Sequence, residues 1–199
     1  MSTYERSASG SGRLGFIEFA LSAFAFLLRR GFEVVLYEPT RLVFESSAVF
    51  VSVYHGRSSY QVGLEIGHMG RDRRKYSLHE ILAALAPGEV EKARCQTTDP
   101  DVLERCLSSI ADVVERTCGP LLAGDIGAFE DLRIAAAPRR KAATLEAQFG
   151  AILDRADQAW DAKDFHRAKL LYQKAETALD GVRRRRLEYL IGREDETTG

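Results

Sequence analysis

Four short stretches with a two-residue hydrophobic period, all within residues 33–68, constrain the fold of this chain more than any other feature. These stretches are Glu33 to Glu38, Arg41 to Ser46, Ala48 to His55 and Tyr60 to His68. Such alternation is typical of half-buried β-strands. The connections contain the turn-forming residues Pro39, Ser47 and Gly56, and they are too short for anything except antiparallel neighbours. The segment is therefore predicted to form a four-stranded antiparallel meander.

The alternation also predicts which side chains share a face of this sheet. One apolar face is expected to meet a helix, and it consists of Val34, Leu36, Leu42, Phe44, Val49, Val51, Val53, Val62, Leu64 and Ile66. The other face carries the candidate interface residues, which are Tyr37, Phe50 and Tyr54 above Val35 and Val43, with Arg57 and Tyr60 at the adjoining turn. Exposed aromatic side chains suit a protein partner. A cover of helices from residues 100–137, or from the C-terminal part, is an equally good interpretation.

The segment before the sheet has the period of a helix. Leu14, Ile17, Leu21, Phe24 and Leu28 recur at helical spacing, and Gly31 follows as a typical helix stop. The stretch also resembles a signal sequence. However, Glu18 interrupts it, and its roughly 15 residues fall short of the roughly 20 that span a bilayer. A buried first helix is the preferred interpretation, and residues 1–13, rich in Ser and Gly, are predicted to be a disordered leader.

Capping residues mark the helices that follow the sheet. Ser77 and Glu80 form a capping box, in which each side chain accepts a backbone N–H of the other residue, so a helix is predicted to run to Ala86. Asp99, followed by a proline, is predicted to begin a helix that ends near Thr117. Asp125 is expected to begin a short helix through Leu132. Residues 14–137 are thereby predicted to form an α+β domain.

The composition changes at Pro138, which is followed by three basic residues and is the predicted domain boundary. Three amphipathic helices follow: a long one, one beginning after Asp164 and one beginning at Gly181. Residues 138–194 are accordingly predicted to be a helical domain, and residues 195–199 a disordered tail.

Within this domain, the segment from Ala156 to Leu179 resembles the second half of a tetratricopeptide repeat. Ala156, Ala168, Tyr172 and Ala175 occupy the positions where that repeat has small or aromatic packing residues. The chain departs from the pattern at Lys163, where the repeat has glycine, and at Asp180-Gly181, where it has proline. Because one unit cannot bury both of its faces, the resemblance implies packing on another surface or on a second copy, and it does not carry over peptide binding.

Four stretches of the first domain carry a second resemblance, which are Phe16 to Leu28, Tyr60 to Gly67, Tyr76 to Leu82 and Leu122 to Asp125. On these stretches the domain resembles small, functionally uncharacterised bacterial proteins that are similar in outline to immunity proteins paired with polymorphic toxins. The resemblance covers about residues 14–132 and implies no active site.

Composition narrows the remaining function classes. The 199 residues carry a formal net charge of -1, so no global field attracts a polyanion or an anionic membrane. The three cysteines, Cys95, Cys106 and Cys118, lack a close C-x-x-C pair, which favours reduced thiols in the cytoplasm, with Cys106 packed in the core.

Complete catalytic, metal or phosphate-binding motifs are not found in the sequence, so no catalytic residue, metal site or cofactor is predicted. The four histidines are not at metal-ligand spacing. His55, Ser58 and Glu65 are the only local grouping that suits a nucleophile with its base, and a polar hairpin loop is the preferred interpretation of these residues.

Three basic clusters remain, of which the last two form the candidate basic patch. They are Arg71, Arg73, Arg74 and Lys75; Arg139, Arg140 and Lys141; and Arg183, Arg184, Arg185 and Arg186. Four consecutive helical residues point in different directions, because each is rotated by about 100° from the last. The leading hypothesis is therefore a non-enzymatic, cytoplasmic protein-binding module of the immunity, antitoxin or adaptor kind, whose partner is a toxin or its own copy. A nucleic-acid-associated regulator that uses the basic clusters is the alternative, and a hydrolase is third. A membrane partner is not expected.

Overall fold

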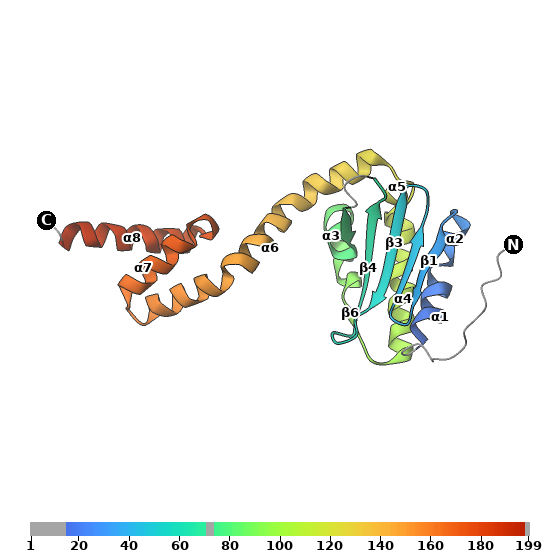
Figure 1. Cartoon of the computed structure of the whole chain (residues 1–199), viewed down its shortest axis with the longest axis horizontal. Coiled ribbons are helices and arrows are strands. Elements are labelled where there is room, and N and C mark those ends of the chain that lie inside the picture. Colours follow the sequence, from blue (N-terminus) through green and yellow to red (C-terminus); the bar gives the residue numbers. More distant parts are fainter. Residues whose placement is uncertain (1–14, 71–73, 198–199) are drawn as a thin grey trace. The chain divides into compact units, whose positions relative to one another are not determined.

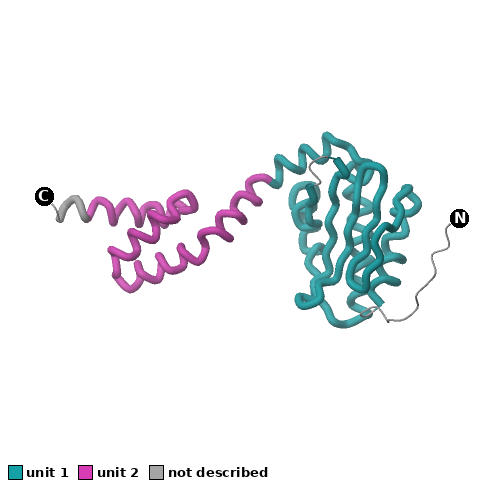
Figure 2. The backbone as a smooth tube through the Cα atoms, in the orientation of Figure 1, with its two compact units in different colours: residues 1–136 teal, residues 137–199 magenta. Residues whose placement is uncertain are grey.

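The computed structural model describes residues 15–70 and 74–197, with side chains described as far as Arg193. It confirms a mixed α+β fold in which a helix precedes an antiparallel sheet and further helices follow. The chain divides into two compact units, residues 1–136 (unit 1) and residues 137–199 (unit 2), which are coloured separately in Figure 2. The predicted leader, residues 1–13, lies outside the described residues.

The predicted meander is present. Its strands are β1 (Glu33–Glu38), β2 (Arg41–Glu45), β3 (Val49–His55) and β4 (Gln61–His68), each antiparallel to the next (Figure 1). Two further strands, β5 (Lys75–Ser77) and β6 (Cys95–Gln96), both pair with β4 and extend the sheet beyond the prediction. Strands of three and two residues are too short to show a period in the sequence.

Helices cover one face of this sheet in unit 1. They are α1 (Phe16–Ala23), α2 (Ala25–Arg29), α3 (Leu78–Leu85), the 3-10 helix η2 (Pro87–Ala93), α4 (Pro100–Thr117), α5 (Gly119–Leu122) and the beginning of α6 (Ile126–Asp161). In Figure 1, α1, α2 and α4 lie behind the strands, and no described helix of unit 1 crosses the opposite face. Buried side chains from both layers form the core, among them Phe16, Leu27, Phe44, Val51, Leu64, Ile81, Leu107 and Val114.

The predicted helix caps are present, whereas the prediction of one continuous helix before the sheet is wrong. Ser77 and Glu80 form the complete capping box of α3, and Asp99 caps α4 through the backbone N–H of Val102. The single helix predicted before the sheet is two helices, because the backbone at Phe24 departs from helical geometry.

Among the described residues no helix is both long and apolar enough to cross a membrane.

A β-bulge in β1 changes which residues share a face. The pairs before it are Glu33 with Glu45 and Val34 with Phe44, and the pairs after it are Leu36 with Val43, Tyr37 with Leu42 and Glu38 with Arg41. Directly paired residues point to the same side of a sheet. Leu36 therefore lies on the face away from the helices, together with Val43, and Tyr37 lies on the side of Leu42. The predicted assignment of Leu36 and Tyr37 is wrong, because simple alternation does not survive a bulge.

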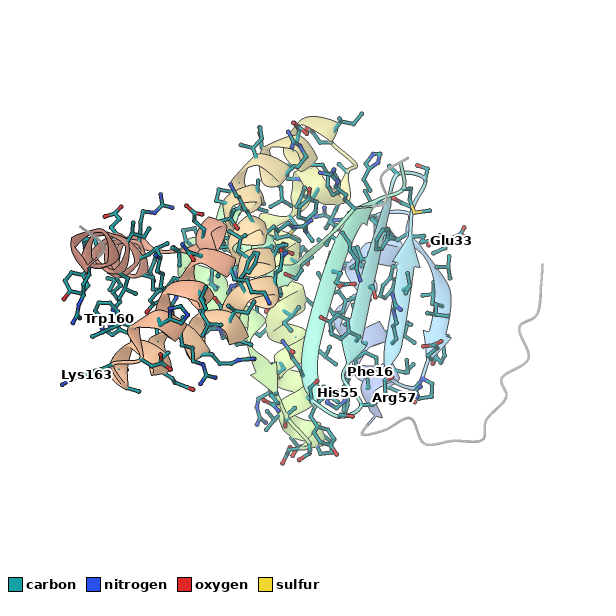
Figure 3. The ribbon with its side chains drawn as sticks, turned by 60° about the vertical axis from the view of Figure 1, so that its left-hand side comes forward. Phe16, Glu33, His55, Arg57, Trp160 and Lys163 are labelled. Atoms are coloured by element: carbon teal, nitrogen blue, oxygen red, sulfur yellow. A yellow bond between two sulfur atoms is a disulfide. The ribbon has the colours of Figure 1, made fainter. Side chains whose placement is uncertain are left out.

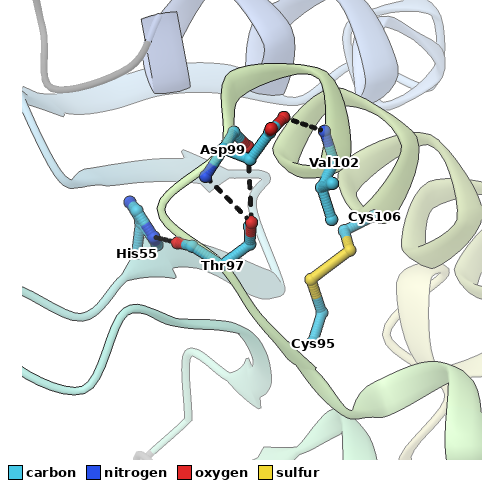
Figure 4. Close-up of a disulfide and its surroundings, with 6 residues drawn as sticks. All are labelled: His55, Cys95, Thr97, Asp99, Val102 and Cys106. Carbon is cyan, nitrogen blue, oxygen red and sulfur yellow. Dashed lines mark hydrogen bonds between the residues drawn. A yellow bond between two sulfur atoms is a disulfide. The ribbon is translucent and has the colours of Figure 1, made fainter.

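The prediction of three reduced thiols is also wrong. Cys95 in β6 and Cys106 in α4 form a disulfide bond (Figure 4). Asp99 begins α4 only a few residues after β6, so the chain reverses and brings the second turn of the helix back alongside the strand. Cys106 is half-exposed rather than packed in the core. Cys118 is free and buried, and its burial raises the pKa of the thiol.

The same segment is held to the sheet by hydrogen bonds. The backbone N–H of Thr97 donates to the carbonyl oxygen of Tyr60 over 3.0 Å. His55 Nε2 lies 3.0 Å from the Thr97 carbonyl oxygen and donates to it, as Figure 4 shows. His55 is 2% exposed and stacks on Phe16, and both side chains lie at the same end of the sheet in Figure 3. This histidine is therefore part of the packing between β3, α1 and the segment after β6.

Unit 2 is a small helical assembly with its own core. It contains the rest of α6, followed by α7 (Phe165–Lys174), the 3-10 helix η3 (Glu176–Ala178) and α8 (Gly181–Thr197). The four residues that carry the repeat-like pattern, Ala156, Ala168, Tyr172 and Ala175, are fully buried. Lys163 has a φ of 58° at the turn between α6 and α7, a conformation that glycine adopts with little strain and lysine does not.

The structure corrects two further boundaries. The helix expected to end near Leu132 and the one expected beyond Pro138 are one helix, α6, which continues through Pro138. Pro138 has no backbone N–H to donate, so α6 lacks one of its hydrogen bonds there, but the residues on both sides of it remain helical. The predicted tail at residues 195–199 is helical as far as Thr197, and residues 198–199 lie outside the described part.

Candidate functional site

The face of the sheet away from the helices (the outer face) holds a shallow groove. The groove has a volume of about 320 Å³ and is lined by Val35, Leu36, Arg41, Val43, Glu45, Phe50 and Met69. Five of these seven residues are apolar, and none of the seven belongs to the helix-covered core of unit 1. The bulge creates one wall, because it places Val35 and Leu36 next to each other on this side. We call these seven residues the outer groove.

Aromatic rings lie flat on the outer face because β4 has glycines opposite them. Phe50 pairs with Gly67, and Tyr54 pairs with Gly63. A Cβ atom at either glycine would overlap the ring of its partner. The rings therefore cover backbone that a larger residue would occupy, and they give this face a flat aromatic floor.

Charged residues lie around this floor in an uneven pattern. Lys75 pairs with Glu65 at 2.9 Å, and Arg41 Nε donates to Ser52 Oγ at 3.0 Å. Burial, and then the charge of Glu65, raise the pKa of Tyr54, which stays protonated at neutral pH. At the other end of the groove, Glu33 and Glu45 are direct cross-strand partners. Neither carboxylate has a cation beside it in the described part of the chain, so two negative charges face each other there.

The five candidate interface residues do not form one surface. Phe50 and Tyr54 lie on the outer face, whereas Tyr37 is 61% exposed on the opposite side, paired with Leu42. Arg57 is exposed at the β3–β4 turn, where Figure 3 shows it near His55. Tyr60 has a φ of 51°, and its ring contacts His55 at a centroid distance of 6.2 Å. Only two of the five residues therefore contribute to the outer face.

The arginine cluster of α8 is divided between two environments. Arg183 and Arg186 bind Asp157 at 2.7 and 2.9 Å, and Arg186 also lies over the Trp160 ring at 5.0 Å. The Tyr172 hydroxyl donates to Asp157 at 2.7 Å. Burial opposes ionisation of Asp157, but the hydrogen bonds from Arg183 and Tyr172 outweigh it and lower the pKa of this carboxyl. Two of the four arginines therefore connect the helices of unit 2.

The remaining basic residues are on the surface of unit 2. Arg184 and Arg185 are exposed, as are Arg139 and Lys141 on α6, while Arg140 is half-exposed. The predicted basic surface is thus reduced to these positions.

The grouping considered for a hydrolase is not assembled. His55 lies on the helix-covered face of β3, and Ser58 is exposed in the turn after it. Glu65 pairs with Ser52 on the outer face and binds Lys75. The base and the carboxylate are therefore on opposite sides of the sheet. Within the described residues, histidine, cysteine, aspartate and glutamate side chains do not form a cluster of three or more that suits a metal ion.

Sequence reasoning placed Glu45 on the outer face but missed Leu36, Met69 and the cross-strand partner of Glu45, which is Glu33. One signal was present in the two-residue connection at Pro39-Thr40. In a regular hairpin of that length, Tyr37 faces Leu42 and Leu36 faces Val43, which is the observed pairing.

Comparison with known proteins adds no constraint. No protein-family model matches this chain, and no curated protein or solved structure is detectably similar to it.

Proposed function

We propose that this protein is a non-enzymatic protein-binding module that acts through the outer face of its sheet. The outer groove is the observation that carries the proposal. A groove with an apolar floor and walls, bordered by charged residues, has the composition of a protein interface, in which an apolar centre is surrounded by a polar rim. Exposed Val35 and half-exposed Phe50 and Met69 supply that centre.

An immunity, antitoxin or adaptor role is the form of this proposal that agrees with the resemblance of residues 14–132. In such a role the protein occludes a partner and needs no reacting centre of its own. The alternative of a nucleic-acid-associated regulator is weaker, because Arg183 and Arg186 form ion pairs with Asp157 within the chain.

A cytoplasmic location was predicted from reduced thiols, and the disulfide removes that argument, because such bonds persist mainly in oxidising compartments. Trapping the thiols of Cys95 and Cys106 inside host cells tests the location. A reduced pair supports the cytoplasm, and an oxidised pair contradicts it.

Affinity capture with a matched pair of variants tests the proposed function. Val35 is 51% exposed in the outer groove, and Val182 is 53% exposed on α8 of unit 2. Val35→Asp and Val182→Asp therefore introduce the same charge at equal exposure, and neither position belongs to a core cluster. We expect a host protein captured by the wild-type chain to be retained by Val182→Asp and lost by Val35→Asp. Equal capture by both variants would contradict binding through the outer face.

A further inference from the structure

Among the described residues, the outer groove lies next to an open edge of the sheet. β1 is the terminal strand of the order β1-β2-β3-β4-β5, whereas the far side of β4 is covered by β5 and β6. An edge strand presents unpaired backbone N–H and C=O groups to which another strand can bind. Val35, at the centre of β1, is at once an edge residue and a wall of the groove. A strand added to this edge places its side chains directly beside the groove.

The charges along β1 disfavour a second copy of the chain at this edge. Full-length antiparallel pairing of β1 with β1 of another copy places Glu33 of each copy opposite Glu38 of the other. Like charges that face each other across a strand pair are destabilising. The edge is therefore protected against its own copy.

The same charges favour a partner that carries a cation. Glu33 already faces Glu45 across β1 and β2, and no cation accompanies either carboxylate within the described residues. Figure 3 shows the Glu33 side chain at the outer edge, pointing away from the sheet. At the other end of β1, Glu38 faces Arg41, so charge is balanced there. A lysine or arginine opposite Glu33 lies next to two carboxylates and relieves their repulsion.

The position of the groove fixes the register of such a partner. Glu33 and Leu36 both point to the outer face. β2 shows the spacing that a regular strand has beside β1, because Glu45 and Val43, two residues apart, face Glu33 and Leu36. A partner strand therefore carries its cation and the apolar residue that enters the groove two positions apart. Adjacent positions would send the two side chains to opposite faces.

We propose that β1 binds an extended segment of a partner protein by strand addition, with a basic residue opposite Glu33 and an apolar residue two positions away over the outer groove. This proposal rests on the proposed function and names the chemistry of its partner. The affinity comes from backbone hydrogen bonds to β1, and the specificity comes from the cation and the groove.

Short peptides test the register directly. The probe is an acetylated and amidated hexapeptide, Thr-Val-Thr-Lys-Thr-Thr, in which valine precedes lysine by two positions, as Val43 precedes Glu45 in the antiparallel strand β2. Its isomer Thr-Thr-Val-Lys-Thr-Thr has the same composition with the two residues adjacent, and a third peptide replaces lysine with glutamate. We expect the probe to bind the full-length chain about fivefold more tightly than either control. In amide NMR spectra the shift changes should be confined to β1 and the outer face.

The variant Glu33→Lys distinguishes charge-specific strand addition from nonspecific peptide binding. The new lysine faces Glu45 within the chain, so the variant should unfold at a temperature no lower than the wild type. It should nevertheless lose the preference for the lysine probe and gain affinity for the glutamate peptide. A probe methylated on the backbone nitrogens that face β1 keeps its charge and should bind at least about fivefold more weakly.

Three outcomes would overturn the proposal. They are equal binding of the two isomers, an unchanged preference in Glu33→Lys, and a concentration-dependent dimer whose contacts map to β1. Failure here is distinguishable from failure of the proposed function. If the peptides fail while Val35→Asp still loses a partner that Val182→Asp retains, the outer face binds protein by another geometry.

Discussion

Removing the Cys95–Cys106 disulfide should destabilise unit 1 by about 3 kcal/mol. The bond joins residues with a sequence separation of 11. In the chain-entropy relation, a closed loop of this size restricts the unfolded state by about 3 kcal/mol at 25 °C. With a urea m value of about 1.5 kcal/mol/M, the unfolding midpoint of unit 1 falls by about 2 M. The perturbation is either a dithiol reductant or the double variant Cys95→Ser/Cys106→Ser.

The chain supplies an internal control for this measurement. Its single tryptophan, Trp160, belongs to unit 2. Tryptophan fluorescence therefore reports unit 2, and the circular dichroism of the sheet reports unit 1. Reductant should move the unfolding transition of unit 1, seen by circular dichroism, and leave that of unit 2, seen by fluorescence, unchanged. It should have no effect on either transition of the double variant. Before reduction, thiol titration of the unfolded chain should find one thiol, Cys118. A shift in unit 1 below about 1 kcal/mol, or a titration of three thiols, would refute the reasoning.

Three further perturbations follow from local geometry. Lys163→Gly should raise the stability of unit 2 by about 1 kcal/mol in thermal unfolding followed by Trp160 fluorescence, because it relieves a positive φ, whereas Lys163→Ala, which keeps the strain, should give no such gain. Because the pKa of Asp157 is lowered in the folded state, its contribution to the stability of unit 2 is complete above its unfolded-state pKa of about 4 and is lost as the pH falls below that value. Asp157→Asn should lower the stability of unit 2 by about 2 kcal/mol at pH 7 and make its unfolding less dependent on pH in acid. An unchanged acid unfolding profile in this variant would count against the network around Asp157. Gly67→Ala should destabilise unit 1 by about 2 kcal/mol in urea, because its Cβ overlaps the Phe50 ring, and a neutral result would show that the ring does not lie there.

Features set by neighbouring residues were predicted well from the sequence. The strand boundaries, the capping box at Ser77 and the start of α4 at Asp99 depend on hydrophobic period and on side chains within one helical turn. The separation of the arginine run was also foreseeable, because Arg183 and Arg186 are three residues apart and share a helix face. The side chain that they both bind, Asp157 on α6, is distant in sequence and was not predicted.

Features that depend on contacts between distant segments were missed. The disulfide requires β6 to lie beside the second turn of α4, and the spacing of Cys95 and Cys106 does not predict this arrangement. The bulge in β1 exchanged the faces of Leu36 and Tyr37, although the short turn before β2 contained a clue. The outer face was thus predicted correctly for β2, β3 and β4, whereas in the edge strand β1 the positions of Leu36 and Tyr37 were exchanged.

Photo-crosslinking in host cells tests most directly whether the outer face of the sheet binds protein. A photoreactive phenylalanine analogue is introduced at position 35 in one chain and, as the control, at position 182 in another, since the two native valines are 51% and 53% exposed. We predict a discrete protein adduct on illumination from position 35 and none from position 182. Adducts from both positions in equal yield, or from neither, would contradict the account.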